Sequence, residues 1–434
     1  MNFSLPPTAL DGRTILRFAH AYETGGGTER YLDDLDNALL QRHALTIYRL
    51  HLTKRSPAPP PEAEAIGRGR LIRVPLPILP GNSAPSADQE HSLKARVKQV
   101  IRDFVLYNPV VWQVAGAKWT SRRRLHPEPG QAIDAGQMTE QIMRETHVDL
   151  VMLHFFGGAD AEEVIAAAQA QGVPMALLNH FANERYLHLA IRKHVMMAHA
   201  AAGVNGLDVP PYTRAKFTNL SDGVDTDFFQ AAKARALDHR PAQPVILLPA
   251  RVIREKGQLD LVRAAARVRQ AGVDCCVAFA GRVDSSGFVD ELKAEISRHD
   301  MGERTHFLGV LGLEELRDWY AASTMVALPT YHHEGLPRVI LEAQAMSRPV
   351  LAYTMGGVAD GVQHGKTGYL FSPGDVSGLA SRLRELLATP ALVSTMGRNG
   401  RAVAEERFSL DRLSERHARF YSEVMARQAK HDTA

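Results

Sequence analysis

Residues 325–353 place the strongest constraint on how this chain folds. The apolar run 325–328 predicts a buried strand, and a loop follows at 331–335. A helical pattern begins at Pro337, and residues 349–353 predict the next strand. In such a βαβ unit the loop lies at the carboxyl end of the first strand, where open parallel sheets bind ligands. The helix N-terminus there offers free amide groups to a phosphate.

Two carboxylates frame this loop. Glu334 lies within it, and Glu342 lies in the following helix beside Val339 and Ala343. A carboxylate on an apolar face needs a partner, because burying an unpaired charge is costly. Sugar hydroxyls are one candidate partner for Glu342. The alternative is a local ion pair with Arg338 four residues earlier, which contributes only about 0.2–0.5 kcal/mol.

The segment from Glu334 to Glu342 matches the E-x7-E motif of retaining glycosyltransferases. Its sequence Glu-Gly-Leu-Pro-Arg-Val-Ile-Leu-Glu-Ala resembles glycosyltransferase family 4, as do Gly356-Gly357 and residues 365–375 that follow. The resemblance implies the GT-B fold, in which two Rossmann-like domains with doubly wound parallel sheets face each other across a cleft. It implies a retaining transfer of a sugar from a UDP- or GDP-sugar to a hydroxyl acceptor.

The bulk composition narrows the class of protein. A net charge of +3 is too small to favour nucleic acid as a partner, and no nucleic-acid-binding motif occurs. Cys275 and Cys276 are neighbours in an apolar strand pattern, which predicts core residues in a reducing compartment rather than a disulfide. No apolar run reaches about 18 residues and no export signal is recognisable. We therefore expect a cytoplasmic protein that does not cross a membrane.

Strands and helices alternate in both halves of the 434-residue chain, which predicts two doubly wound parallel sheets. The predicted parts are an N-terminal acceptor-side domain (1–225) with a basic, proline-rich insertion at about 54–130, a linker (226–243), a C-terminal nucleotide-sugar-binding domain (244–408), and a C-terminal helix (409–434) that packs back on the first domain.

The first strand, at 14–19, leads to three glycines and then to a helix for which Thr28 is the predicted cap. The predicted apolar stripe of this helix is Leu32, Leu35 and Leu39. Gly26-Gly27-Thr-Glu-Arg-Tyr resembles the glycine loop of family 4, which lies at the interdomain cleft near acceptor and donor diphosphate. A flexible turn is the alternative interpretation of these glycines.

A buried strand at 149–153 delivers His154 to its carboxyl end. In family 4 a histidine at this position lies near the reacting sugar, and His154 matches it; a structural histidine is the alternative. His180 follows the strand at 174–178 and falls near another family histidine, but we expect only a packing role for it.

The second domain opens with a strand at 245–248 and a loop that carries Arg251 and Lys256. Cations at a strand end can neutralise a diphosphate, each charge-assisted hydrogen bond contributing about 1.5–3 kcal/mol. The alternative is surface charge with Glu255 as a partner. Both cations match family residues that hold the nucleotide diphosphate, and Gly309 matches the corner that binds the base.

The resemblance implies catalytic roles for Glu334, Arg251, Lys256 and His154, and donor-binding roles for Glu342, Gly335, Leu336, Gly309, Gly26 and Gly27. Pro337 departs from the glycine of many relatives and cannot donate an amide hydrogen bond to the donor sugar. No cluster with metal-ligand spacing occurs, so we expect neither a metal nor a cofactor.

A helical pattern at 93–105 carries Lys94, Lys98 and Arg102 beside its apolar face, and Trp112 follows. This combination is typical of a helix that lies on an anionic membrane surface. It favours a peripheral enzyme at the inner face of the membrane with a lipid-linked glycan acceptor, as in cell-surface polysaccharide or lipopolysaccharide synthesis. The alternatives are a domain helix with solvated lysines, transfer to a small soluble acceptor, and a non-catalytic nucleotide-sugar-binding protein.

Overall fold

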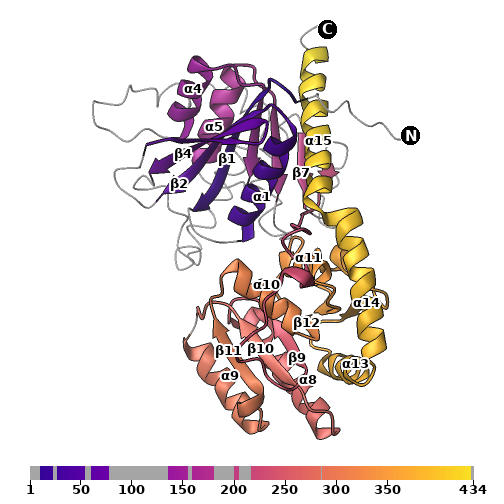
Figure 1. The fold of residues 1–434 in the computed structure, drawn as a ribbon. Helices are drawn as coiled ribbons and strands as arrows, with labels where there is room; N and C mark the ends of the chain where they lie inside the picture. Colours follow the sequence, from indigo (N-terminus) through magenta and orange to yellow (C-terminus); the bar gives the residue numbers. More distant parts are fainter. Residues whose placement is uncertain are drawn as a thin grey trace.

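The computed structural model shows two α/β domains, one built on each of two sheets (Figure 1). The described residues are 10–22, 27–53, 60–77, 135–154, 159–179, 200–204, 217–284 and 286–431. Gly26, His180 and the basic segment 93–124 lie outside them. Within the described ranges, every helix is too short or too polar to span a bilayer.

The described strands of the N-terminal domain form one sheet in the order β3-β4-β2-β1-β5-β6-β7-β8. They are β1 (Thr14–Tyr22), β2 (Thr46–Thr53), β3 (Glu62–Ile66), β4 (Gly69–Pro77), β5 (Leu150–His154), β6 (Met175–Asn179), β7 (Ala200–Gly203) and β8 (Phe217–Asn219). All neighbouring strands run parallel except β3 and β4. The predicted parallel sheet is confirmed, with one antiparallel strand added at its edge.

That edge lies inside the segment that the sequence analysis assigns to an insertion. Strand β4 pairs in parallel with β2 from Thr46 to Thr53, so it belongs to the sheet itself. Strand β3 is exposed at its first four residues, and its Glu64 accepts a 2.7 Å hydrogen bond from Arg73 of β4. Glu and Ala alternate along the first four residues of β3, but alanine is a poor strand former and is exposed here like glutamate, so the sequence pattern does not predict the strand.

Helices cover both faces of this sheet. They are α1 (Gly27–Arg42) and α15 (Leu410–His431) on one face, and α4 (Ala135–Glu145) and α5 (Ala159–Ala170) on the other (Figure 1). Alternate strand residues supply the two cores, as Ile15 and Leu16 of β1 do. The predicted stripe of α1, Leu32, Leu35 and Leu39, is buried as expected. Helix α1 begins at Gly27, however, so Thr28 lies inside the helix and the predicted cap is wrong.

The described strands of the C-terminal domain form a wholly parallel sheet in the order β11-β10-β9-β12-β13-β14. They are β9 (Val245–Leu248), β10 (Cys276–Ala280), β11 (Thr305–Gly309), β12 (Met325–Leu328), β13 (Val350–Tyr353) and β14 (Gly368–Phe371). The helices are α8 (Gln258–Gln270), α9 (Ser286–Arg298), α10 (Leu313–Ala322), α11 (Arg338–Ala345), α12 (Val358–Gly361), α13 (Val376–Ala388) and α14 (Pro390–Val403). Cys275 and Cys276 are buried and not disulfide-bonded, as predicted.

The last helix, α15, returns to the N-terminal domain and packs against α1 (Figure 1). Its buried apolar residues Leu413, Phe420 and Val424 share a core with the leucine stripe of α1. Beneath them Arg17 of β1 is fully buried, forms an ion pair with Asp36 of α1, and donates a 3.0 Å hydrogen bond to Tyr421 of α15. One buried guanidinium therefore joins a strand and both helices of this layer.

Ion pairs also join the two domains directly. Helix α1 carries Arg30 and Asp34 one turn apart, and α11 carries Arg338 and Glu342 one turn apart. The residues pair crosswise, Arg30 with Glu342 and Arg338 with Asp34. Arg338 also lies 3.3 Å from a carboxylate oxygen of Asp222. Burial raises the pKa of Asp222 to about 6, although the neighbouring Arg338 acts in the opposite direction.

We expect Phe420→Ala to lower the free energy of unfolding by about 3–5 kcal/mol, because it opens a cavity between α15 and α1. Urea denaturation followed by circular dichroism measures the change. The control is Glu423→Ala on the exposed face of the same helix, which should change stability by less than about 0.5 kcal/mol. Equal effects of the two substitutions would mean that α15 does not depend on this core.

Asp222→Asn should alter how stability depends on pH. The pKa of Asp222 is about 6 in the folded protein against a reference value of 3.8, so between these values only the folded state keeps the proton. The stabilisation is complete below pH 3.8 and is lost as the pH rises through about 6. Relative to the variant, the wild type should lose on the order of 2–3 kcal/mol over this window. Parallel stability curves for the two proteins would contradict this expectation.

Candidate functional site

The predicted site loops leave the same edge of the C-terminal sheet. Strands β9 and β12 are parallel neighbours, so their following loops, 249–257 and 329–337, both start at carboxyl ends. The backbone N–H of Tyr331 donates a 2.7 Å hydrogen bond to the carbonyl of Glu255, and the Thr330 hydroxyl donates to the same carbonyl at 3.1 Å. The two loops are therefore bound to each other before any ligand arrives.

Lys256 and Glu334 form an ion pair between these loops. Lys256 ends the short 3-10 turn η5 (Arg254–Lys256), and Glu334 also accepts a 3.3 Å hydrogen bond from the Thr330 hydroxyl. The exposed fractions of the Lys256 and Glu334 side chains are 13% and 16%. The structure thus places a cation and a carboxylate, both only partly open to solvent, at the edge where a parallel sheet binds ligands.

Gly257 makes this close approach possible. Its φ of 74° lies in the left-handed region, and a Cβ atom there would come within 1.9 Å of the Pro329 carbonyl oxygen. A larger residue at 257 would push the two loops apart and separate Lys256 from Glu334.

The arginines of the same edge have other partners. Arg251 is 51% exposed and lies 3.0 Å from Asp284, which also pairs with Arg282. These hydrogen bonds, that of Arg282 foremost, lower the pKa of Asp284, so it is an anion that a diphosphate could replace as the partner of Arg251. Arg254, in contrast, forms an ion pair with Glu291. Glu255, the partner that sequence analysis left open, is not the acceptor of these side-chain bonds.

Glu342 is buried and fully engaged. It accepts hydrogen bonds from Arg30 and, at 2.9 Å, from Tyr320, while Arg338 lies 3.9 Å away. The expectation that this carboxylate needs a partner is met, but its main protein partner is an arginine from the other domain rather than the local Arg338. Burial, with Glu342 beside it, raises the pKa of Tyr320 well above its usual value, so Tyr320 remains a hydrogen-bond donor.

The remaining donor-side residues offer backbone groups. Leu336 follows Gly335 and is buried against Ile340 and Gly361, so only its main chain could meet a ligand. Gly309 ends β11 with a φ of 70°, and its carbonyl accepts a 2.7 Å hydrogen bond from Gly281. Open space surrounds the Cβ position of Gly309.

The first turns of α1 connect the predicted site residues of the N-terminal domain with those of the C-terminal domain. His154 is the last residue of β5, as predicted, and is fully buried. Its ring lies 6.4 Å, centroid to centroid, from that of Tyr31. Gly27 begins the same helix, and Arg30 reaches across to Glu342. Consecutive residues of α1 thus contact a predicted residue in each domain.

Sequence reasoning assigns no role to Arg30, although it lies within the quoted glycine motif. The one available signal is the shared spacing, since α1 and α11 each carry an arginine and then a carboxylate one turn later. Asp260, in the first turn of α8, is also missed; it accepts hydrogen bonds from Tyr331 and Tyr353 at 2.6 and 2.8 Å.

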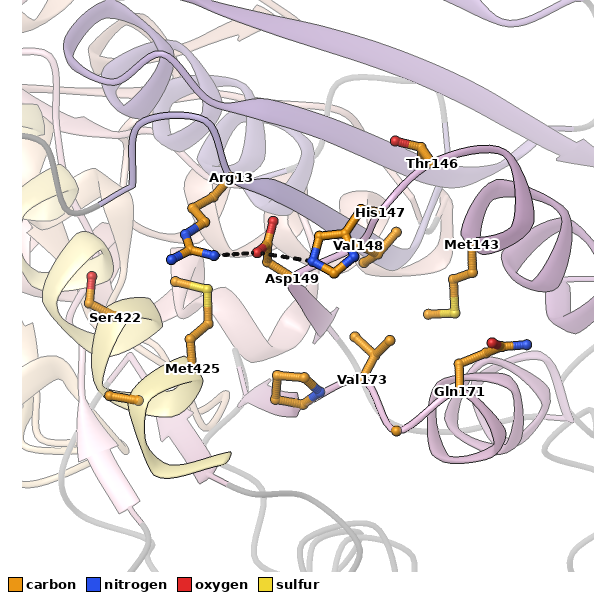
Figure 2. Close-up of a pocket in the computed structure, with 13 residues that line it drawn as sticks. Arg13, Met143, Thr146, His147, Val148, Asp149, Gln171, Val173, Ser422 and Met425 are labelled. Atoms are coloured by element: carbon orange, nitrogen blue, oxygen red, sulfur yellow. Dashed lines mark hydrogen bonds and ion pairs between the residues drawn. The ribbon is translucent and has the colours of Figure 1, made fainter. Parts of the chain in front are cut away.

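A hollow in the N-terminal domain lies at the opposite end of its strands (Figure 2). It is lined by residues that precede β1, β5 and β6, including Arg13, His147, Asp149 and Val173, and by Met425 of α15. Asp149 there accepts 2.7 and 2.8 Å hydrogen bonds from the Arg13 side chain and the Thr14 amide. The amino ends of parallel strands are not where such sheets bind substrates, so this hollow is not the candidate site.

No group of three His, Cys, Asp or Glu side chains within the described part of the chain is arranged to hold a metal ion. Whether the protein needs a metal or a cofactor stays a prediction.

Residues 229–403 match the family described as glycosyl transferases group 1. A similar protein is the GDP-mannose-dependent alpha-(1-6)-phosphatidylinositol monomannoside mannosyltransferase of Mycolicibacterium smegmatis, 31% identical over 214 residues. That match covers 44% of this chain and 55% of the relative, so the chain spans about half the length of the curated relative.

Solved structures resemble nearly the whole chain in fold. A glycosyltransferase of Rickettsia africae has a TM-score of 0.67 at 17% identity, covering 95% of this chain and 98% of that one. The HepE protein of Anabaena in complex with UDP has a TM-score of 0.61 at 18% identity, covering 94% and 100%. These likenesses confirm the GT-B fold. In sequence, residues 229–403 are similar to the glycosyl transferases of group 1, and in fold the chain is similar to two-domain glycosyltransferases.

Proposed function

We propose that this protein is a retaining glycosyltransferase of family 4 that moves a sugar from a nucleotide diphosphate sugar to a hydroxyl acceptor. The observation that carries the proposal is the Lys256–Glu334 ion pair at the carboxyl edge of β9 and β12. The pair lies within the segment that matches glycosyl transferases of group 1. Lys256 supplies a positive charge for the departing diphosphate, and Glu334 supplies a negative charge for the sugar, on which positive charge develops during transfer.

In the proposed reaction the acceptor hydroxyl attacks the anomeric carbon on the face from which the diphosphate departs. The bond from that carbon to the diphosphate oxygen breaks, and a phosphate oxygen of the leaving group takes the acceptor's proton. Lys256 and Arg251 stabilise the negative charge that grows on the diphosphate. Glu334 positions the donor sugar and stabilises the positive charge that develops on it. No side-chain nucleophile is required.

The remaining residues bind and orient the donor. Glu342 binds the ribose hydroxyls, which then compete with Arg30 for its carboxylate. His154 contacts the transferred sugar from the N-terminal domain. We assign the main chain at Gly335 and Leu336 to the donor sugar and that at Gly309 to the base. The main chain at Gly26 and Gly27 is assigned to the diphosphate. Closure of the domains excludes water, so that transfer is faster than hydrolysis.

The proposed donor is a UDP- or GDP-sugar, and the proposed acceptor is a lipid-linked glycan at the cytoplasmic face of a membrane. The name of the Mycolicibacterium relative specifies GDP-mannose and a phosphatidylinositol glycoside, and the Anabaena structure contains UDP. The basic pattern at 93–105 supports a membrane-bound acceptor. The alternatives are a small soluble acceptor and a nucleotide-sugar-binding protein without turnover.

Calorimetry with a panel of UDP-, GDP- and ADP-sugars tests the donor site. One of them should bind, and Lys256→Ala and Glu342→Ala should each weaken binding about 10- to 150-fold, the equivalent of one or more charge-assisted hydrogen bonds. Arg254→Ala is the matched control, because Arg254 lies on the same turn but pairs with Glu291. Binding that survives both site substitutions, or is equally sensitive to the control, would exclude this donor site.

A second experiment tests whether the protein binds to an anionic membrane. Neutralising Lys94, Lys98 and Arg102 together should release the protein from anionic vesicles in a sedimentation assay, since each basic residue near such a surface contributes about 1 kcal/mol. The control removes three exposed lysines outside this segment, Lys233 of the linker and Lys293 and Lys366 of the C-terminal domain, and changes the net charge equally. Unchanged sedimentation of the first variant, or equal release of both, would favour the soluble acceptor.

A further inference from the structure

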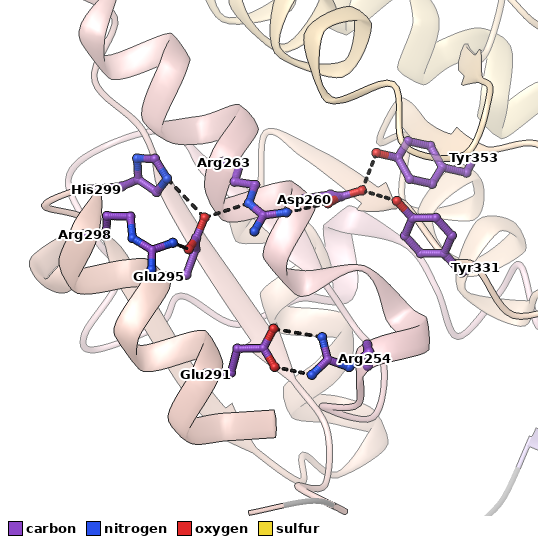
Figure 3. Close-up of polar contacts among 9 residues, drawn as sticks. All are labelled: Arg254, Asp260, Arg263, Glu291, Glu295, Arg298, His299, Tyr331 and Tyr353. Atoms are coloured by element: carbon purple, nitrogen blue, oxygen red, sulfur yellow. Dashed lines mark hydrogen bonds and ion pairs between the residues drawn. The ribbon is translucent and has the colours of Figure 1, made fainter. Parts of the chain in front are cut away.

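Asp260 lies behind the candidate site and takes no part in the chemistry proposed above. It is in the first turn of α8, three residues after Gly257, and its residue is 6% exposed. One of its carboxylate oxygens, Oδ2, accepts hydrogen bonds from two phenols, at 2.6 Å from Tyr331 and 2.8 Å from Tyr353 (Figure 3). Its other oxygen, Oδ1, lies 3.6 Å from Arg263.

The two tyrosines come from different kinds of structure. Tyr331 is 42% exposed and belongs to the loop that carries Glu334, three residues later. Tyr353 is the fully buried last residue of β13, where strand pairing with β14 already fixes it. The bond to Tyr353 therefore anchors Asp260 to the core, and the bond to Tyr331 anchors a loop to Asp260.

The loop is held to the α8 side by a short series of contacts. The Tyr331 amide and the Thr330 hydroxyl both donate to the carbonyl of Glu255, and the Tyr331 phenol donates to Asp260. The same Thr330 hydroxyl lies 3.3 Å from a carboxylate oxygen of Glu334, so its one proton is shared between the two acceptors. The position of the Glu334 carboxylate relative to Lys256 thus depends on bonds made on either side of Tyr331.

A second set of charges supports Asp260 from its other side. Arg263 donates a 2.6 Å hydrogen bond to Glu295, which also accepts from Arg298 and lies 3.2 Å from His299 (Figure 3). Arg263 is thereby held between two carboxylates. Burial, followed by the bond to Asp260, raises the pKa of Tyr331 to about 12, so its phenol remains a donor at neutral pH.

We propose that Asp260 is a positioning residue, which acts through Tyr331 to fix loop 329–336 so that the Glu334 carboxylate meets Lys256 and the donor sugar. The inference rests on the proposed donor site at Glu334 and Lys256. It adds that the site depends on a buried carboxylate that never touches the donor.

Tyr331→Phe and Tyr353→Phe make a matched pair, since each removes one phenol donor from the same oxygen of Asp260 and keeps its ring. A purely structural role for Asp260 predicts that the more buried Tyr353 matters at least as much. The positioning role predicts that Tyr331→Phe weakens binding of UDP-glucose or GDP-mannose about tenfold, the equivalent of one hydrogen bond to a charged group. Tyr353→Phe should lower the melting temperature and leave binding near the wild-type value, because Arg263 and the backbone of α8 still hold Asp260 in place.

Hydrogen exchange followed by mass spectrometry gives a readout that needs no ligand. Amides of 329–336 should exchange faster in Tyr331→Phe than in the wild type or Tyr353→Phe, because the loop opens more often. Asp260→Ala should accelerate exchange as Tyr331→Phe does, and Asp260→Asn, which keeps an acceptor oxygen, should restore most of the protection.

The outcomes separate this inference from the proposed function. If the wild type binds no nucleotide sugar, the donor site fails, and the exchange data alone decide whether Asp260 fixes the loop. If the wild type binds but the two phenylalanine variants bind and exchange alike, the positioning role is wrong and the donor site stands. Exchange in 329–336 that is unaffected by Asp260→Ala would also overturn the inference.

Discussion

The arrangement of the two domains depends on two crossed ion pairs between helices α1 and α11. Arg30 and Asp34 of α1 pair crosswise with Glu342 and Arg338 of α11, and Asp222 adds a further carboxylate to Arg338. Buried ion pairs are sensitive to geometry, because each charge has lost its water and is stabilised only if its partner is in place. Burial raises the pKa of Asp222 to about 6. The carboxylates of this cluster also outnumber its guanidinium groups. The interface is thus specific in orientation and sensitive to protonation.

Helix α1 transmits this arrangement to the candidate site. The ion pair between the buried Arg17 of β1 and Asp36 holds this helix against the sheet, and the apolar face of α15 packs against it. Its Arg30 contacts Glu342 of the C-terminal domain, and its Tyr31 lies beside His154 of the N-terminal sheet. A nucleotide sugar whose ribose hydroxyls donate hydrogen bonds to Glu342 would therefore act on the same residue that pairs with the other domain, which couples ligand binding to domain position.

Within the C-terminal domain, backbone geometry rather than side-chain chemistry brings Lys256 and Glu334 of the candidate site together. Parallel pairing of β9 and β12 sends two loops out of one edge of the sheet, and the left-handed Gly257 allows them to touch. The Lys256–Glu334 pair forms where they meet. Asp260 then holds the second loop through Tyr331, so that this loop is tied to a helix and a strand of the core.

The sequence by itself determined the alternation of strands and helices, the stripe of α1, and the placing of His154 at the end of one strand and of Glu334 in the loop after another. These features depend on residues close together in the chain, whose periodicity and spacing act locally. Only the tertiary structure decided that Glu342 pairs with Arg30, 312 residues away, and that an exposed edge strand continues the N-terminal sheet. Contacts between distant segments depend on how layers pack, and the exposed edge strand offers only alternating glutamate and alanine, a weak strand signal, so neither can be recognised from local pattern.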